Sequence, residues 1–167
     1  MVEMGKKFVF ITLLAVLLLL NANSGFAEFQ REKVFIAAST ETIPYNHDSF
    51  AFGGGVSFGY GTGAAVGIKL AWFLGLEGMN ALELNVFLKY FLLDKYADTG
   101  PFLQLMLGPV IFNRVDEFSI GSDKGSMTGG LGFGWRFLFG DIWYVEPMVR
   151  GGYPYIISAG VSGGIRL

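Results

Sequence analysis

The sequence predicts an all-β protein, an eight-stranded antiparallel transmembrane β-barrel with up-and-down topology. The first observation behind this prediction is a strict period of two between Thr128 and Phe139, where large apolar side chains alternate with glycine and one arginine. The apolar set is Leu131, Phe133, Trp135, Phe137 and Phe139, and the alternate set is Gly130, Gly132, Gly134 and Arg136. Because successive side chains of a strand point to opposite faces, one face suits lipid and the other suits a narrow polar interior.

The second observation is a hydrophobic composition that contains no candidate for a spanning helix beyond residue 20. Hydrophobic residues make up 52% of the 167 residues, yet charges such as Lys69 and Glu83 interrupt every later apolar run before it reaches the roughly 20 residues that a transmembrane helix needs. The net charge of −2, with no basic block, argues against a nucleic-acid partner. The absence of cysteine excludes a disulfide scaffold and a thiolate metal site, and we expect no metal or cofactor.

The third observation is an export signal in residues 1–27. Lys6 and Lys7 precede an apolar run from Phe8 to Leu20, and small residues follow up to Ala27, which is the pattern of a cleaved secretory signal peptide. An uncleaved anchor helix is the alternative. We therefore expect a signal peptide over residues 1–27 and an outer-membrane β-barrel over residues 28–167.

Alternation and turn residues predict the strands in order. The expected strands are 28–38, 50–60, 64–74, 81–92, 101–112, 128–139, 143–150 and 155–167. The first strand has the weakest pattern, Pro109 predicts a bulge in the fifth because it cannot donate to the ladder, and Tyr155 is expected to face outward. An even count places the loops at 39–49, 75–79, 113–125 and 151–154 outside the cell, and the turns at 61–63, 94–100 and 140–142 in the periplasm.

The hairpin at residues 128–150 predicts its own register. A three-residue turn at 140–142 sets Phe139 opposite Trp143 and Arg136 opposite Glu146. The same topology gathers an aromatic girdle near the periplasmic interface. Its members are Tyr60, Tyr90, Phe139 and Trp143.

Seven charged residues fall on inward positions of the predicted strands. They are Lys69, Glu83, Lys89, Arg136, Glu146, Arg150 and Arg166. Unpaired charges in so small an interior are costly, and we expect Lys69 to pair with Glu83 and Arg136 with Glu146. Closed pairs predict a structural polar core in a barrel with a structural or surface-interaction role. The surplus of positive charge favours the alternative, a narrow passive channel for small, anionic solutes.

Catalysis has little support in the sequence. The only histidine, His47, is followed by Asp48 and Ser49, and three consecutive side chains do not converge as a catalytic triad. The glycines at 130, 132 and 134 recur inside a strand and do not form a nucleotide-binding loop. We expect no catalytic residues and no enzyme activity.

With its alternating strands, its hairpin at 128–150 and its export signal, the chain resembles the small eight-stranded outer-membrane proteins of diderm bacteria, the group that contains OmpX, OmpW and the OmpA membrane domain. The resemblance covers residues 28–167 and implies a monomer in contact with outer-membrane lipid, inserted by the outer-membrane assembly machinery. It implies structural, adhesive or small-solute roles. Some small outer-membrane lipid acyltransferases are also eight-stranded barrels with a His-Asp-Ser set in outer loops, so a lipid-modifying enzyme is a third alternative.

Overall fold

A computed structural model describes residues 33–46, 49–76, 79–93, 99–114 and 124–167. The predicted signal peptide at 1–27 lies outside these residues. Among the residues that are described, no helix has the length and hydrophobicity to cross a membrane.

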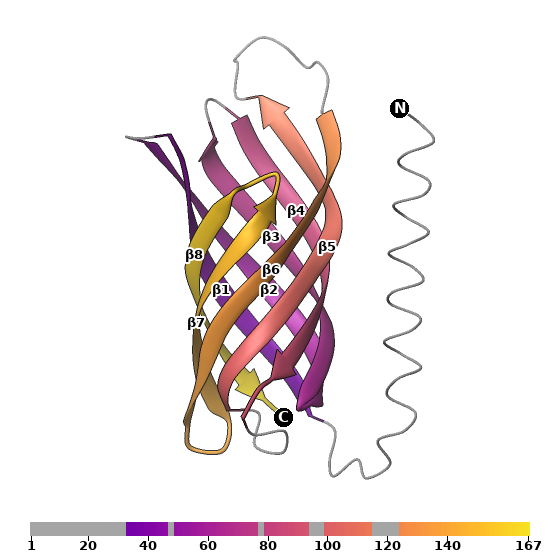
Figure 1. Ribbon diagram of the computed structural model, residues 1–167, viewed down its shortest axis with the longest axis vertical. Helices are drawn as coiled ribbons and strands as arrows, with labels where there is room; N and C mark the ends of the chain where they lie inside the picture. The colour runs from indigo at the N-terminus through magenta and orange to yellow at the C-terminus, as the bar shows by residue number, and fades with distance from the viewer. Residues whose placement is uncertain (1–32, 47–48, 77–78, 94–98, 115–123) are drawn as a thin grey trace. The chain divides into compact units, whose positions relative to one another are not determined.

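Eight antiparallel strands close into one barrel in which each strand pairs with its neighbour in sequence and the last pairs with the first (Figure 1). The strands are β1 (Val34–Asn46), β2 (Ser49–Thr62), β3 (Ala64–Leu76), β4 (Met79–Phe91), β5 (Gly100–Arg114), β6 (Lys124–Phe139), β7 (Trp143–Tyr153) and β8 (Ile157–Arg166). The predicted fold class is confirmed. Closure leaves no unpaired edge along the middle of the wall, as a hydrocarbon environment requires.

The first strand differs from its prediction. It runs from Val34 to Asn46, through residues that the sequence assigned to the loop 39–49. Polar residues and Pro44 made this stretch read as a loop, but pairing of β1 with β8 ends at Thr42 and Ala159, so Pro44 lies beyond the last β8 partner. A proline is tolerated at such a position, where part of the ladder is already absent.

The hairpin of β6 and β7 has the predicted register. Phe139 pairs with Trp143 across the turn, and Gly140 in that turn has a φ of 67°, which favours glycine. The bulge predicted at Pro109 is wrong. Glu83 pairs with Val110 and Val86 with Leu107 in a single register, so proline interrupts the ladder without inserting a residue.

Gly108, beside Pro109, marks a close approach of β5 to β4. A Cβ added at Gly108 would lie 2.8 Å from the Cα of Asn85, closer than side chains pack. Glycine at this position therefore lets the two backbones meet beside the interrupted ladder.

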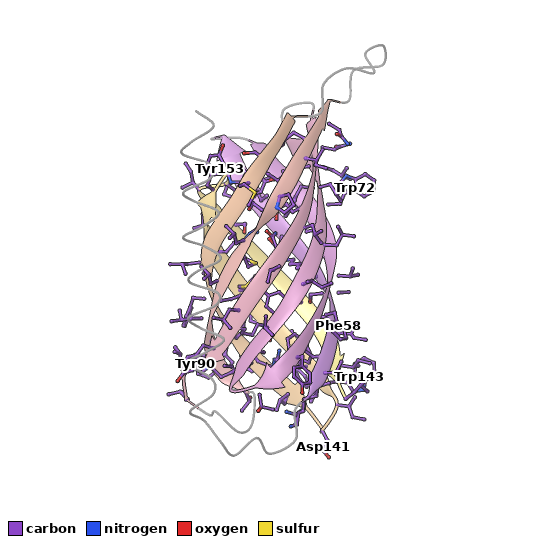
Figure 2. The ribbon with its side chains drawn as sticks, turned by 90° about the vertical axis from the view of Figure 1, so that its right-hand side faces the viewer. Phe58, Trp72, Tyr90, Asp141, Trp143 and Tyr153 are labelled. Atoms are coloured by element: carbon purple, nitrogen blue, oxygen red, sulfur yellow. The ribbon has the colours of Figure 1, made fainter. Side chains whose placement is uncertain are left out.

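The outward face of the barrel consists mainly of apolar side chains. Leu131 is 66% exposed and Phe133 49%, a surface that water would not accommodate but lipid does. Figure 2 places Trp72 and Tyr153 near one end, and Tyr90 and Trp143 near the other. We call the end where β1 begins and β8 ends the terminal end. All four predicted girdle residues are exposed there, since Tyr60 and Tyr90 flank the turn after β2, and Phe139 and Trp143 flank the turn after β6.

Inward side chains fill the barrel in two apolar clusters with polar groups between them. The cluster away from the terminal end comprises Ile43, Ala51, Ala71, Phe73, Ala81 and Val110, with Phe112 and Tyr155 packed against it. The cluster toward the terminal end comprises Phe35, Ala37, Ala65, Phe87, Met106 and Tyr144. The outward orientation predicted for Tyr155 is wrong, because β8 begins at Ile157 and alternation does not extend into the turn before it.

Candidate functional site in the barrel interior

Seven charged side chains are buried in the described part of the barrel, four cations and three carboxylates. They are Glu41, Lys69, Glu83, Lys89, Arg136, Glu146 and Arg150. Six of them were assigned to the interior from the sequence, because they occupy the inward positions of strands with a period of two. Arg166 was also assigned there, but it is only half-buried, and its Nε donates to the backbone oxygen of Asp141 at 2.9 Å.

Glu41 is the interior charge that the sequence reasoning missed. It lies on β1 within the stretch that was read as a loop. The signal was present, because Phe35, Ala37 and Ser39 continue through Glu41 to Ile43 at a period of two. The polar Ser39 and the strand-breaking Pro44 nevertheless led to the assignment of this stretch to a loop.

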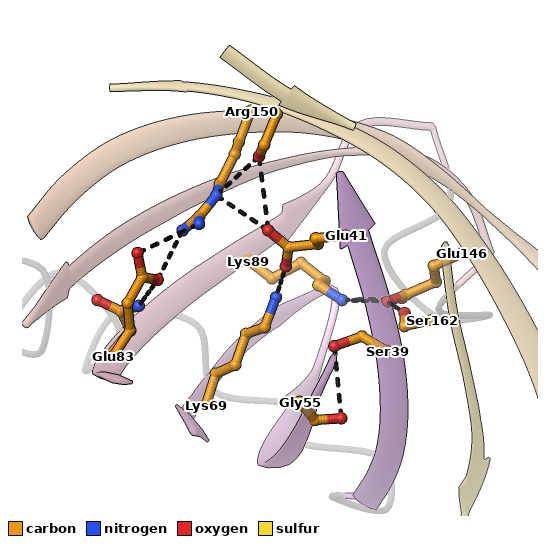
Figure 3. A network of polar contacts seen from close by, with 11 residues as sticks. Ser39, Glu41, Gly55, Lys69, Glu83, Lys89, Glu146, Arg150 and Ser162 are labelled. Carbon is orange, nitrogen blue, oxygen red and sulfur yellow. Dashed lines mark hydrogen bonds and ion pairs between the residues drawn. The ribbon is translucent and has the colours of Figure 1, made fainter. Parts of the chain in front are cut away.

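Four of the buried charges form one network, the Arg150 cluster, made of Glu41, Lys69, Glu83 and Arg150 (Figure 3). Arg150 joins the two carboxylates, with Nε 3.1 Å from Oε2 of Glu41 and Nη1 3.2 Å from Oε2 of Glu83. Lys69 pairs with the other oxygen of Glu41. Two cations thus face two carboxylates, and the cluster is electrically balanced.

The predicted pair of Lys69 with Glu83 is wrong. Lys69 pairs with Glu41 of β1, and Glu83 pairs with Arg150 of β7. Inward parity brings Lys69 and Glu83 to one face on adjacent strands, but a long side chain in a narrow barrel also reaches strands that are not its neighbours. Asn85 completes the environment of Glu83 by donating to its Oε2 at 2.9 Å.

The other three charges form the Glu146 cluster, in which one carboxylate accepts from two cations. Arg136 Nε lies 2.6 Å from Oε1 of Glu146, which confirms the predicted pair. Lys89 Nζ lies 2.7 Å from Oε2, and Ser162 donates to the same oxygen at 3.2 Å. This cluster carries a net charge of +1.

Aromatic rings surround both cations of the Glu146 cluster. The guanidinium carbon of Arg136 lies 4.1 Å from the ring centroid of Tyr144 and 4.8 Å from that of Phe91. The ammonium of Lys89 lies 4.4 Å from the centroid of Phe102. A desolvated cation over a ring gains about 2 kcal/mol, so the rings offset part of the cost of burying the extra charge.

A small cavity lies between the two clusters. Its volume is about 30 Å³, and a buried water needs roughly 10 to 15 Å³ on this measure. The lining includes Glu41 and Lys69 from one cluster and Lys89 and Glu146 from the other, together with Ser57 and Gln104. The cavity has room for one or two small solutes and is too small to be a pore.

No metal centre emerges in the described residues. Nowhere among them do three His, Cys, Asp or Glu side chains gather to hold a metal ion. His47 and Asp48, which precede Ser49 in the sequence, lie outside the described residues.

Comparison with solved structures decides what this architecture is. The N-terminal β-barrel domain of Pseudomonas aeruginosa OprF matches with a TM-score of 0.54 and 15% identity over 81% of this chain and 97% of that one. Neisserial surface protein A matches with a TM-score of 0.58 and 15% identity over 81% and 96%. The chain has the fold of the small eight-stranded outer-membrane barrels. The Yersinia pestis outer membrane protein Ail, in a phospholipid bilayer nanodisc, also matches, with a TM-score of 0.54 and 10% identity over 82% and 100%.

At these identities the likeness shows the fold alone. No protein-family model matches the chain, and no curated protein matches it. The predicted resemblance to small outer-membrane barrels is therefore confirmed at the level of architecture, and the role of this barrel has to come from its own interior and surface.

Proposed function

We propose that this protein is a closed, non-conducting outer-membrane barrel whose role is structural or is exercised through contacts at the cell surface. The observation that carries the proposal is that the interior of the barrel is filled by paired charges and leaves little free space. Every buried charge in the described strands belongs to an ion-paired cluster, and the cavity between the clusters has a volume of only about 30 Å³.

The two apolar clusters support closure at both ends of the interior. On the side away from the terminal end, Phe73 and Tyr155 lie with ring centroids 5.6 Å apart over the Arg150 cluster. Toward the terminal end, Phe91 and Phe102 lie 5.8 Å apart beside the Glu146 cluster. A hydrated ion crossing the barrel would have to displace both ring pairs and separate buried ion pairs, which is energetically costly.

A closed barrel interacts through its wall and through the connections between its strands. The wall is apolar and suits outer-membrane lipid. β1, β3, β5 and β7 end away from the terminal end, and in the proposed orientation these strand ends face the outside of the cell. The proposal includes no catalytic activity, and we expect the outer-membrane assembly machinery to insert the barrel as a monomer.

The runner-up function is a narrow channel for small anions, and one observation favours it. The described interior holds one more cation than carboxylate, as an anion-selective lumen would. Among the described residues, however, this surplus does not leave an unpaired cation free to attract anions through a lumen. Lys89 and Arg150 bind carboxylates, and Arg166 contacts Asp141 at the terminal end.

A planar bilayer recording separates the two functions. The wild-type protein should show no unitary conductance, and neither should Arg136→Ala, because Lys89 continues to pair with Glu146 in that variant. A shift in gel mobility between boiled and unboiled samples verifies that each preparation holds a folded barrel. Stable anion-selective channels in the wild type, with selectivity lowered in Arg136→Ala, would replace the closed barrel with the channel.

A further inference from the structure

The surplus charge is confined to one part of the interior. The Arg150 cluster has two cations for two carboxylates, whereas the Glu146 cluster has Lys89 and Arg136 for the single carboxylate of Glu146. A net charge in so dry an environment is costly. The aromatic rings around Arg136 and Lys89 reduce that cost, but they carry no net charge.

The cavity lies beside this surplus. Lys89 of the Glu146 cluster and Lys69 of the Arg150 cluster both line it, so two ammonium groups face one small space. Glu41 and Glu146 line it as well, but each of these carboxylates is already bound by two cations. The negative charge of each carboxylate is therefore compensated by its two bound cations.

Two further polar side chains line the cavity with their hydrogen-bonding capacity unused. Gln104 is 5% exposed, and within the described residues neither its amide nor the hydroxyl of Ser57 hydrogen-bonds to another residue. A buried amide is stabilised by a hydrogen-bonding partner, and a solute in the cavity would supply one to Gln104 and to the half-buried Ser57.

We propose that this cavity binds one small monovalent anion of halide size. The anion accepts hydrogen bonds from the ammonium of Lys89, the amide NH₂ of Gln104 and the hydroxyl of Ser57, and it neutralises the Glu146 cluster. Chloride is close to a water molecule in size and fits a space of about 30 Å³. Water would satisfy the same donors but would leave the charge in place. The inference rests on the closed interior proposed above.

Halide-dependent stability tests the proposal. The thermal midpoint Tm of protein purified in a zwitterionic detergent is measured in sodium chloride and in sodium gluconate of equal ionic strength and pH. Gluconate is too large for the cavity. The expected result is a Tm that rises with chloride concentration and saturates, because a ligand that binds only the folded state stabilises it, with no equivalent rise in gluconate.

Two substitutions locate the effect. Gln104→Leu removes one donor at similar volume and should raise the chloride concentration for half of the effect by about tenfold or more, since a hydrogen bond to a charged group is worth roughly 1.5 to 3 kcal/mol. Thr128→Val removes a buried hydroxyl that donates to the backbone oxygen of Tyr153 and does not line the cavity, so it should leave the chloride response unchanged. Ser57→Ala replaces Gln104→Leu if the latter does not fold.

Equal Tm values in chloride and gluconate would overturn the site, because the cavity would then hold water or the surplus would be removed by loss of a lysine proton. An equal chloride response in the wild type, Gln104→Leu and Ser57→Ala would also overturn it, as a general salt effect. Channel activity in the bilayer recording would defeat the closed barrel separately, because the Tm measurement reports binding and not conduction.

Discussion

Lys89 of β4 reaches across the lumen to Glu146 of β7, with 2.7 Å between Nζ and Oε2. These strands are not neighbours in the barrel. The same two strands are joined a second time by Glu83 and Arg150, at 3.2 Å. Two ion pairs thus connect opposite parts of the wall across the lumen, and we infer that they stabilise the barrel by bracing it from inside.

Glu146→Gln should be the most destabilising single substitution in the Glu146 cluster. It keeps the side-chain volume but leaves Lys89 and Arg136 without a carboxylate, and breaking a buried pair in this way costs about 3 to 5 kcal/mol. Urea unfolding in lipid vesicles, followed by tryptophan fluorescence, gives the free energy of unfolding. Asp141→Asn changes an exposed carboxylate in the turn after β6 and should stay within about 0.5 kcal/mol of the wild type. Equal stability of the two variants would refute the bracing role.

Removal of Lys69 should cost more than removal of Lys89. Lys69→Met leaves Glu41 and Glu83 to share Arg150, so a buried carboxylate is under-compensated, at about 3 to 5 kcal/mol. Lys89→Met leaves Glu146 paired with Arg136 and should cost about 1.5 to 3 kcal/mol, the value of a lost hydrogen bond between charged groups. The two variants make the same chemical change, so each is the control for the other in one unfolding experiment. The reverse order would show that the clusters do not carry the charges assigned to them.

The sequence predicted the wall of the barrel better than its interior. The turn and the register of the β6–β7 hairpin were predicted correctly, because alternation and a three-residue turn together determine the pairing of Phe139 with Trp143. The outer ends of the two strands were predicted too short, since β6 begins at Lys124 and β7 continues to Tyr153. The turn before β8 shows the limit of that reasoning. Alternation describes strands only, so it placed Tyr155 outward although the ring packs inward against Phe73.

Partners across the lumen could not be predicted from the sequence. Alternation determines which face a side chain occupies, but not its height along the barrel axis relative to strands that are not neighbours, which depends on strand tilt and stagger. Lys69 was therefore assigned to Glu83 on the adjacent strand, when its partner is Glu41 two strands away. Arg136 and Glu146 were paired correctly because one hairpin contains both.

The lipid-facing side of β6 should not tolerate charge. Phe133 is 49% exposed and Trp135 42%, and an arginine on the lipid face near the middle of a membrane costs about 2 to 4 kcal/mol. Phe133→Arg should lower the free energy of unfolding in vesicles by that amount, while Phe133→Leu, which keeps the face apolar, should change it far less. Similar stability of both variants would mean that this side of β6 does not contact the hydrocarbon region.

The orientation of the barrel can be determined by labelling, because the chain contains no cysteine and every introduced thiol is unique. Asn113 is exposed near the end of β5, away from the terminal end, and Asp141 is exposed in the turn after β6, at the terminal end. Polar connections lie outside the hydrocarbon region, so both positions should accept a reagent that reaches their side. On intact cells, a membrane-impermeant maleimide should label Asn113→Cys and spare Asp141→Cys. Permeabilising the outer membrane should make both react, which shows that the second thiol is accessible. Labelling of Asp141→Cys alone on intact cells would invert the topology, and the connections after β1, β3, β5 and β7 would then lie in the periplasm, where they could not serve a role at the cell surface.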